Sequence, residues 1–292
     1  MVNALAEQFA LGLSAGGLYA LLALGLTLIY QVSGIVNFAQ GALATVGAYL
    51  VWSLRNDAGL AFGPAALIAV GAAFLLGALL QAILLRPLRR ARAATSVIVT
   101  LGLLIVLEGA IGTIWGDSSR ALILPISPAP VALGPITLGR LDLTTIGAIA
   151  ALIAAFFAFL RWTRAGAAVR AVAQSPQGAR LVGVRVERVG LLAWGISAAI
   201  AATAGVLMAG GTLLIPTMAD TYLLNAFVGA VIGGLESLPG AAIGALLIGV
   251  LQSLLGSYLS LQWRDSVVFA LLLATLLVRP AGLFGAAGQR RV

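Results

Sequence analysis

The sequence predicts an all-α protein, a polytopic helical bundle in a membrane. Of its 292 residues, 61% are hydrophobic and only 9% are charged, whereas soluble domains average about 45–50% apolar and about 25% charged residues. The apolar residues form runs of about 20, the length that crosses the hydrocarbon core as a helix. Thirty-six glycines suit close packing of helices in lipid, because small residues let backbones approach. These observations indicate one transmembrane domain over residues 1–292.

Missing residue types exclude several kinds of chemistry. The chain has no Cys and no His, so we expect no thiol chemistry, no imidazole acid–base catalysis and no metal site of that type. All 17 basic residues are Arg, and they stand at the ends of apolar runs and in short loops, where they indicate orientation in the membrane rather than a nucleic-acid partner. Without Lys, no P-loop of the form GxxxxGK[ST] is possible. We expect no cofactor and no removable signal peptide.

Four apolar runs come first and are predicted to span the membrane. They are residues about 8–30, 39–54, 64–85 and 95–115. Asn37 and Gln40 lie between the first two runs, where they are expected to satisfy backbone groups of an interrupted helix or to contact the solute. Arg86-Pro87 ends the third run, because proline cannot continue helical hydrogen bonding. Glu108 in the fourth run is expected to have a structural role, either at the membrane interface or as a protonated partner of a neighbouring helix.

The next segment, Asp117 to Asp142, is predicted to be an irregular periplasmic connection. It contains four prolines, Pro125, Pro128, Pro130 and Pro135, and proline interrupts regular structure. The fifth span follows at about residues 143–161. Residues 212–221 form a second outside loop that is expected to face a soluble partner.

The longest polar run is Gly166 to Arg188, which we call the basic loop. Arg164, Arg170, Arg180, Arg185 and Arg188 predict that it is cytoplasmic, because basic residues in short loops resist translocation. Ala167 to Ala173 is expected to form one or two helical turns. Ser175-Pro176 can cap a second short helix at Gln177, and Gly183 can end it. The alternative interpretation is an ordinary solvated inside loop.

The last four spans are predicted at about residues 189–211, 222–234, 240–258 and 264–279. A helix of about 13 residues rises only about 20 Å, so a broken or re-entrant pair is expected around Leu238-Pro239-Gly240. Glu236 follows Gly233-Gly234 there and is expected to accept hydrogen bonds from freed backbone N–H groups. The arginines that place the flanking loops inside are Arg86, Arg89, Arg90, Arg92, Arg279, Arg290 and Arg291. Counting back from them places the N-terminus outside.

Motifs along most of the chain carry a resemblance to a known family. They are Leu18-Tyr19-Ala20-Leu21, Gly25-Leu26-Thr27-Leu28-Ile29-Tyr30, Asn37-Phe38-Ala39-Gln40-Gly41, Arg86-Pro87-Leu88-Arg89, Thr100-Leu101-Gly102, Gly233-Gly234-Leu235 with Gly240-Ala241, and Arg279-Pro280-Ala281-Gly282-Leu283-Phe284-Gly285. They resemble the smaller permease of branched-chain amino acid ABC transporters. Gln40 replaces a His that many relatives have.

The basic loop is similar to the coupling motif of ABC importer permeases, a Glu-Ala-Ala triplet followed after three residues by Gly. Here the triplet is Gln-Gly-Ala, and the distal Ile-x-Leu-Pro part is missing. The resemblance implies a set of residues that couple to the ATPase: Arg170, Pro176, Gln177, Gly178, Ala179 and Gly183. A second set of candidates marks helix breaks or the translocation path: Asn37, Gln40, Gly41, Gly233, Gly234 and Glu236.

The resemblance implies a permease subunit in the bacterial inner membrane that imports branched-chain amino acids and is not itself an enzyme. Its expected partners are cytosolic ATP-binding subunits, a sister permease in a homo- or heterodimer, a periplasmic substrate-binding protein and membrane lipid. One alternative is an importer of the same family for urea, amides or another small solute. An ion-coupled secondary transporter is disfavoured, because only Glu108 and Glu236 are available to carry coupling ions. An intramembrane enzyme is disfavoured by the scattered carboxylates and the absence of His and Cys.

Overall fold

The computed structural model of this chain describes residues 2–85, 93–127, 129–133, 136–258 and 261–285. Arg86, Arg89, Arg90, Arg92, Arg290 and Arg291, whose expected position is cytoplasmic, lie outside these ranges, as does Pro135. The chain divides into two compact units. Unit 1 comprises residues 1–27, 126–151 and 222–292, and unit 2 comprises residues 28–125 and 152–221.

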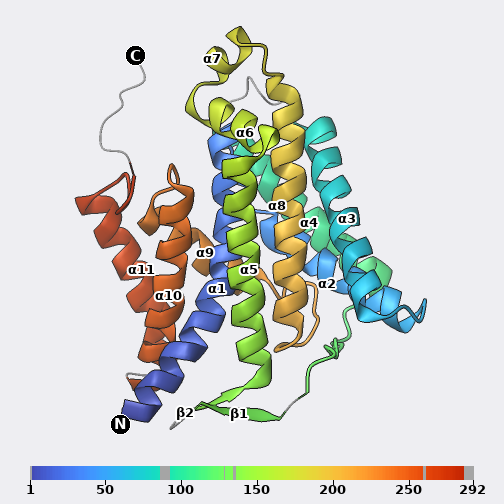
Figure 1. Cartoon of the computed structure of the whole chain (residues 1–292), viewed down its shortest axis with the longest axis vertical. Helices are drawn as coiled ribbons and strands as arrows, with labels where there is room; N and C mark the ends of the chain where they lie inside the picture. Colours follow the sequence, from blue (N-terminus) through green and yellow to red (C-terminus); the bar gives the residue numbers. More distant parts are fainter. Residues whose placement is uncertain (1, 86–92, 128, 134–135, 259–260, 286–292) are drawn as a thin grey trace. The chain divides into compact units, whose positions relative to one another are not determined.

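The predicted spans are confirmed as helices (Figure 1). They are α1 (Val2–Ser33), α2 (Gln40–Asn56), α3 (Phe62–Leu80) continued by the π-helical segment η1 (Gln81–Leu85), α4 (Ala93–Trp115), α5 (Arg140–Trp162), α8 (Val186–Ala209), α9 (Asp220–Gly233), α10 (Leu238–Tyr258) and α11 (Leu261–Val278). The all-α prediction therefore holds. Helix is the expected form in lipid, because it satisfies each backbone group within its own segment.

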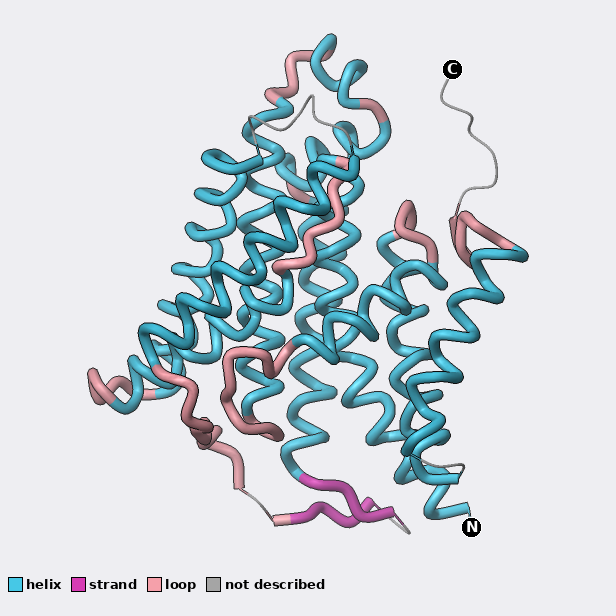
Figure 2. The backbone as a smooth tube through the Cα atoms, turned by 180° about the vertical axis from the view of Figure 1, so that it is seen from behind, coloured by secondary structure: helices cyan, strands magenta, loops and turns pink. Residues whose placement is uncertain are grey.

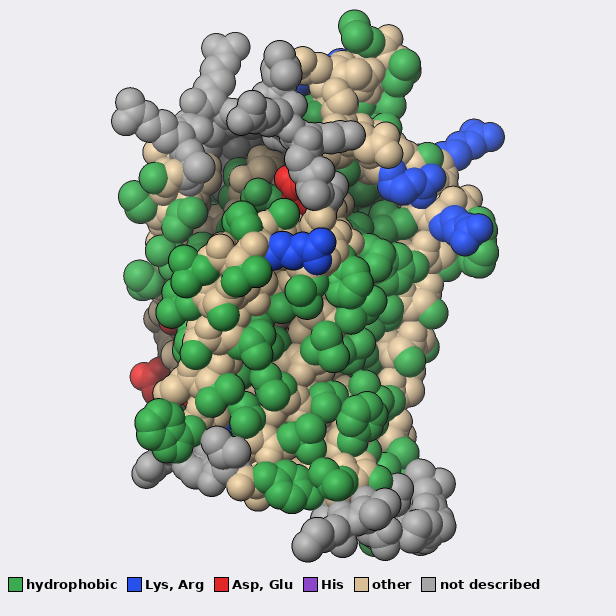
Figure 3. Space-filling model, turned by 90° about the vertical axis from the view of Figure 1, so that its left-hand side faces the viewer, with side chains coloured by type: hydrophobic (Ala, Val, Ile, Leu, Met, Phe, Trp, Pro, Cys, Tyr) green, Lys and Arg blue, Asp and Glu red, His purple; other side chains and the backbone are tan. Residues whose placement is uncertain are grey.

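Six of the described helices are long and apolar enough to cross a membrane. They carry large apolar side chains that the chain leaves exposed, for example Leu67, Leu75, Ile98 and Ile105. Figure 3 shows a broad face covered mainly by hydrophobic side chains, as expected of a surface that contacts lipid tails. The helix α9 has only 14 residues, which confirms the short segment predicted before Leu238.

Unit 2 is built on the packing of α2, α3 and α8, with α4 against α2. Glycines set how closely these helices approach. A Cβ atom added at Gly205 of α8 would lie only 1.9 Å from the carbonyl oxygen of Ala44 of α2. Trp194 of α8 is fully buried and packs with Ile29 and Ile35. Close glycine contacts thus replace large apolar side chains over part of this interface.

Two loops of unit 2 that were both predicted to be outside are joined by backbone hydrogen bonds. The amide of Arg120 donates to the carbonyl of Leu214 (3.1 Å), and the amide of Leu214 donates to the carbonyl of Arg120 (2.8 Å). The Arg120 guanidinium lies 4.2 Å from the ring centroid of Trp52 in α2. These contacts fix both loops to the end of α2.

Unit 1 contains a difference from the expected elements. Within the segment predicted to be irregular, two antiparallel strands form, β1 (Pro130–Leu133) and β2 (Ile136–Gly139), and Val131 pairs with Leu138 (Figure 2). The prediction of an irregular segment was wrong here. Pro130 is the first residue of its strand, and a missing amide is tolerated at that position. Elsewhere in unit 1, α10 packs against α11.

Candidate functional site

The basic loop folds into two short helices within unit 2, α6 (Arg164–Gln174) and α7 (Pro176–Leu181). The side-chain oxygen of Thr163 accepts a hydrogen bond from the Gly166 amide (2.9 Å), and that of Ser175 accepts one from the Gly178 amide (3.1 Å). Both are N-terminal caps, which supply acceptors for amides without helical partners. Pro176 occupies the first turn of α7, where its missing N–H costs nothing.

The end of α7 requires a glycine. Gly183 has a φ of +83°, a left-handed conformation that residues with a side chain adopt at a cost. The amide of Gly183 donates to the carbonyl of Arg180 (3.0 Å), and that of Val184 donates to the carbonyl of Ala179 (2.9 Å). The two-helix form predicted for the basic loop, with its cap at Ser175 and its end at Gly183, is confirmed.

The basic loop has an inner and an outer side. Val169, Val172 and Ala179 are buried, and both short helices contact α8. On the outer side, Leu181 is 90% exposed and Val182 is 77% exposed. Among the candidate coupling residues, Arg170, Pro176, Gln177 and Gly183 are exposed, Gly178 is half-buried and Ala179 is buried. The sequence motif did not single out Leu181 and Val182, which form the apolar tip of the loop.

Asn37 lies between α1 and α2, and Gln40 is the first residue of α2. Both are fully buried in unit 2. The Asn37 side chain accepts a hydrogen bond from the Ala39 amide (3.1 Å) and donates to Gln40 Oε1 (3.2 Å). Gln40 Nε2 donates to the carbonyl of Ser197 in α8 (3.1 Å), and Ser197 Oγ donates back to Gln40 Oε1 (3.0 Å). Gly41 is buried at the start of α2. These side chains tie the helix break to α8.

Glu108 of α4 has a partner that sequence reasoning missed, because the two residues are far apart in the chain. Its carboxyl group adjoins that of Asp220, the first residue of α9. Two carboxyl groups share a hydrogen bond only when one of them carries a proton. The expected role of Glu108 as a protonated partner of a neighbouring segment therefore fits this contact.

The break between α9 and α10 lies in unit 1 and involves Gly233 and Gly234. Gly234 has a φ of +105°, and a Cβ atom added at Gly233 would lie 2.0 Å from the carbonyl oxygen of Gly240. The amides of Leu283 and Phe284 donate to the carbonyls of Ile232 (2.7 Å) and Gly233 (3.1 Å). The segment after α11 thus supplies donors for carbonyls that lack helical partners at the end of α9.

The cap of α10 corrects the expectation for Glu236. Ser237 Oγ, not the Glu236 carboxylate, accepts the hydrogen bond from the Gly240 amide (3.1 Å), and Glu236 is exposed. Serine is a preferred residue at the N-cap of a helix. Its position three residues before Gly240 is the feature of the sequence that could have predicted this cap.

Three comparisons extend this description. A family model described as branched-chain amino acid transport system / permease component matches residues 8–276. The chain is similar to the high-affinity branched-chain amino acid transport system permease protein LivH of Escherichia coli (strain K12), with 32% identity over 96% of this chain and 95% of the relative. It is 30% identical to BraD of Pseudomonas aeruginosa, which has the same description, over 96% and 95%.

The autoinducer 2 import system permease protein LsrC of Escherichia coli is 30% identical over 90% of this chain and 76% of its own length. No solved structure matches the chain. The family match includes the basic loop and all or most of each helix described above.

Proposed function

The chain belongs to the family of branched-chain amino acid transport system permease components, and from this premise we propose that it is the transmembrane subunit of an ATP-binding cassette importer for branched-chain or related hydrophobic amino acids. The chain is a multi-pass transport subunit of the inner membrane and not an enzyme. The observation that carries the proposal is the 32% identity over 96% of the chain, joined to a basic loop whose capped helices present an apolar tip.

ATP hydrolysis is assigned to separate cytosolic subunits. The chain contains no Lys, so it cannot form a P-loop of its own. The exposed tip, Leu181 and Val182, together with Arg170 and Gln177, is the surface that these subunits contact. Because α6 and α7 pack on α8, displacement of the tip is transmitted to a membrane helix, as alternating access by rocking of packed helices requires.

The remaining partners follow from the same assignment. A sister permease, a second copy or a distinct chain, completes the translocation path, and a periplasmic binding protein delivers the solute. The two loops that are joined at Arg120 and Leu214 give the binding protein a fixed surface to contact. Membrane lipid covers the apolar faces of α3 and α4.

Uptake into proteoliposomes of the assembled transporter tests the proposal. We expect ATP-dependent uptake of labelled leucine, isoleucine and valine, and none when ATP is replaced by a non-hydrolysable analogue. Urea, acetamide and autoinducer 2 are the comparison solutes, because a relative at 30% identity is named for autoinducer 2. Preference for one of these solutes would contradict the proposed amino acid substrate. Uptake that follows a proton gradient without ATP would contradict the proposed class of ATP-driven transporter.

A further inference from the structure

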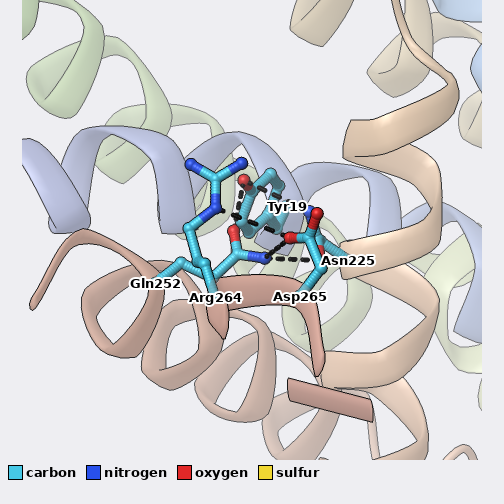
Figure 4. A network of polar contacts seen from close by, with 5 residues as sticks. All are labelled: Tyr19, Asn225, Gln252, Arg264 and Asp265. Atoms are coloured by element: carbon cyan, nitrogen blue, oxygen red, sulfur yellow. Dashed lines mark hydrogen bonds and ion pairs between the residues drawn. The ribbon is translucent and has the colours of Figure 1, made fainter. Parts of the chain in front are cut away.

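A cluster of polar side chains joins α1, α9 and α10 within unit 1 (Figure 4). Tyr19 donates a hydrogen bond from its hydroxyl group to Gln252 Oε1 (2.9 Å), and Gln252 Nε2 donates to Asn225 Oδ1 (2.8 Å). Asn225 Nδ2 lies 3.5 Å from the Tyr19 hydroxyl oxygen. All three side chains are buried. Tyr19, Asn225 and Gln252 therefore form a closed, uncharged set, which we call the polar trio.

The polar trio lies within apolar helices. Tyr19 stands midway along the 29-residue apolar span Leu5–Ser33, and Gln252 lies inside the span Leu238–Tyr258. Polar groups without partners are costly in hydrocarbon. Hydrogen bonds within the trio satisfy most of its polar groups. The trio can therefore hold further polar side chains in place.

A pair of opposite charges from α11 adjoins the polar trio. Gln252 Nε2 also lies 3.5 Å from Asp265 Oδ1, and Arg264 Nε lies 3.5 Å from the same oxygen. The Arg264 and Asp265 side chains are 34% and 57% exposed. Arg264 Nε is nonetheless a buried atom, and it has no hydrogen-bond partner among the described residues. The pair thus combines a buried nitrogen atom with side-chain surface that remains accessible. Figure 4 shows the two side chains beside Gln252.

We propose that Arg264 and Asp265 bind the head group of the transported amino acid, Arg264 its carboxylate and Asp265 its ammonium group. This inference rests on the proposed function and adds to it the residues that contact the solute. A guanidinium group binds a carboxylate with two parallel hydrogen bonds, and an aspartate accepts from an ammonium group. Gln252, held by Tyr19 and Asn225, is the positioning residue that orients Asp265.

Charge balance favours a zwitterion over other solutes. Arg264 and Asp265 neutralise each other at a 3.5 Å separation, and a zwitterion replaces this one pair by two new pairs while the net charge stays zero. A solute with a net charge would leave one charge of the solute or the pair without an opposite partner, which is unfavourable. Urea and amides would leave both protein charges without charged partners. The pair therefore selects α-amino acids by their head group and leaves the side chain to apolar surroundings.

The test uses the assembled transporter in proteoliposomes, with Arg264→Gln, Asp265→Asn and the double variant. We expect each variant to raise the KM for leucine about tenfold or more, the size of a lost hydrogen bond to a charged group, with normal subunit assembly. The double variant is decisive, because it leaves no unpaired charge. If the two charges only balanced each other, the double variant would regain wild-type KM, and that result would overturn the proposal. Arg161→Gln, at an exposed arginine of α5, is the matched control and should leave KM unchanged.

A second measurement does not depend on the stability of any variant. A photoreactive diazirine analogue of leucine, which keeps the head group, is irradiated with the wild-type transporter, and its attachment sites are mapped by mass spectrometry. We expect attachment in residues 222–225 or 263–268 that excess leucine suppresses. If attachment is confined to other helices while leucine is still transported, the proposed site is overturned and the proposed function stands. Uptake of urea in place of leucine by the wild type would overturn the proposed function together with the site.

Discussion

Individual polar residues in these helices are stabilised by partners on other parts of the chain. The partner of Gln40 is Ser197, and the partner of Glu108 is Asp220. In a medium without water, a polar side chain without a partner costs more than the hydrogen bond contributes. The identity of each such residue is therefore set by what its partner can donate or accept.

Replacement of Glu108 by Gln tests this view at one residue. An amide group can donate to the Asp220 carboxylate without a bound proton, so we expect leucine uptake to stay near the wild-type rate. Glu108→Ala, which removes the contact, should lower the stability of the purified protein by about 1 kcal/mol, measured by thermal unfolding in detergent. A collapse of uptake in Glu108→Gln with stability intact would show that the proton shared by the two carboxyl groups takes part in transport.

At the scale of elements, close helix contacts depend on single glycines. Gly205 faces the backbone of α2, and Gly47 of α2 faces Ala202 of α8. Neither position has room for a methyl group, so both glycines allow α2 and α8 to pack closely. Gly71 of α3, by contrast, has no atom within 4 Å of an added Cβ.

Gly205→Ala and Gly71→Ala are a matched pair of variants. We expect Gly205→Ala to destabilise the protein by about 1–3 kcal/mol, because the helices must separate to accept the methyl group. Gly71→Ala should be neutral or stabilising by up to about 1 kcal/mol, because alanine favours helix. Thermal unfolding in detergent measures both. Equal stability of the two variants would contradict the close packing of α2 and α8.

The turn after α7 is the element that shapes the tip of the basic loop. Gly183→Trp places a residue with a side chain at a φ of +83°, at a cost of about 1–2 kcal/mol, and adds bulk beside Leu181 and Val182. We expect this variant, like deletion of residues 177–182, to insert in the membrane but to lose co-purification with the ATPase. Gly183→Asn is the control, since asparagine tolerates this conformation. Co-purification at the wild-type level after Gly183→Trp would count against the assigned contact.

For the whole molecule, hydropathy predicted which segments become helices, because lipid allows few alternatives to a helix for an apolar run. Local rules also predicted the cap of α7 at Ser175 and its end at Gly183. Contacts between distant residues were not predictable: the polar trio joins Tyr19 to residues more than 200 positions away. Single polar residues in apolar runs leave no periodic signal. The coupling motif likewise indicated the basic loop but not which of its residues face outward.

The central claim is that the basic loop is cytosolic and is covered by the ATPase. Because the chain has no Cys, Val182→Cys introduces a single thiol at an exposed position. A membrane-impermeant maleimide should label it in inside-out vesicles and not in right-side-out vesicles, and bound ATPase subunits should protect it. Labelling from the periplasmic side, or labelling that the ATPase leaves unchanged, would contradict the account.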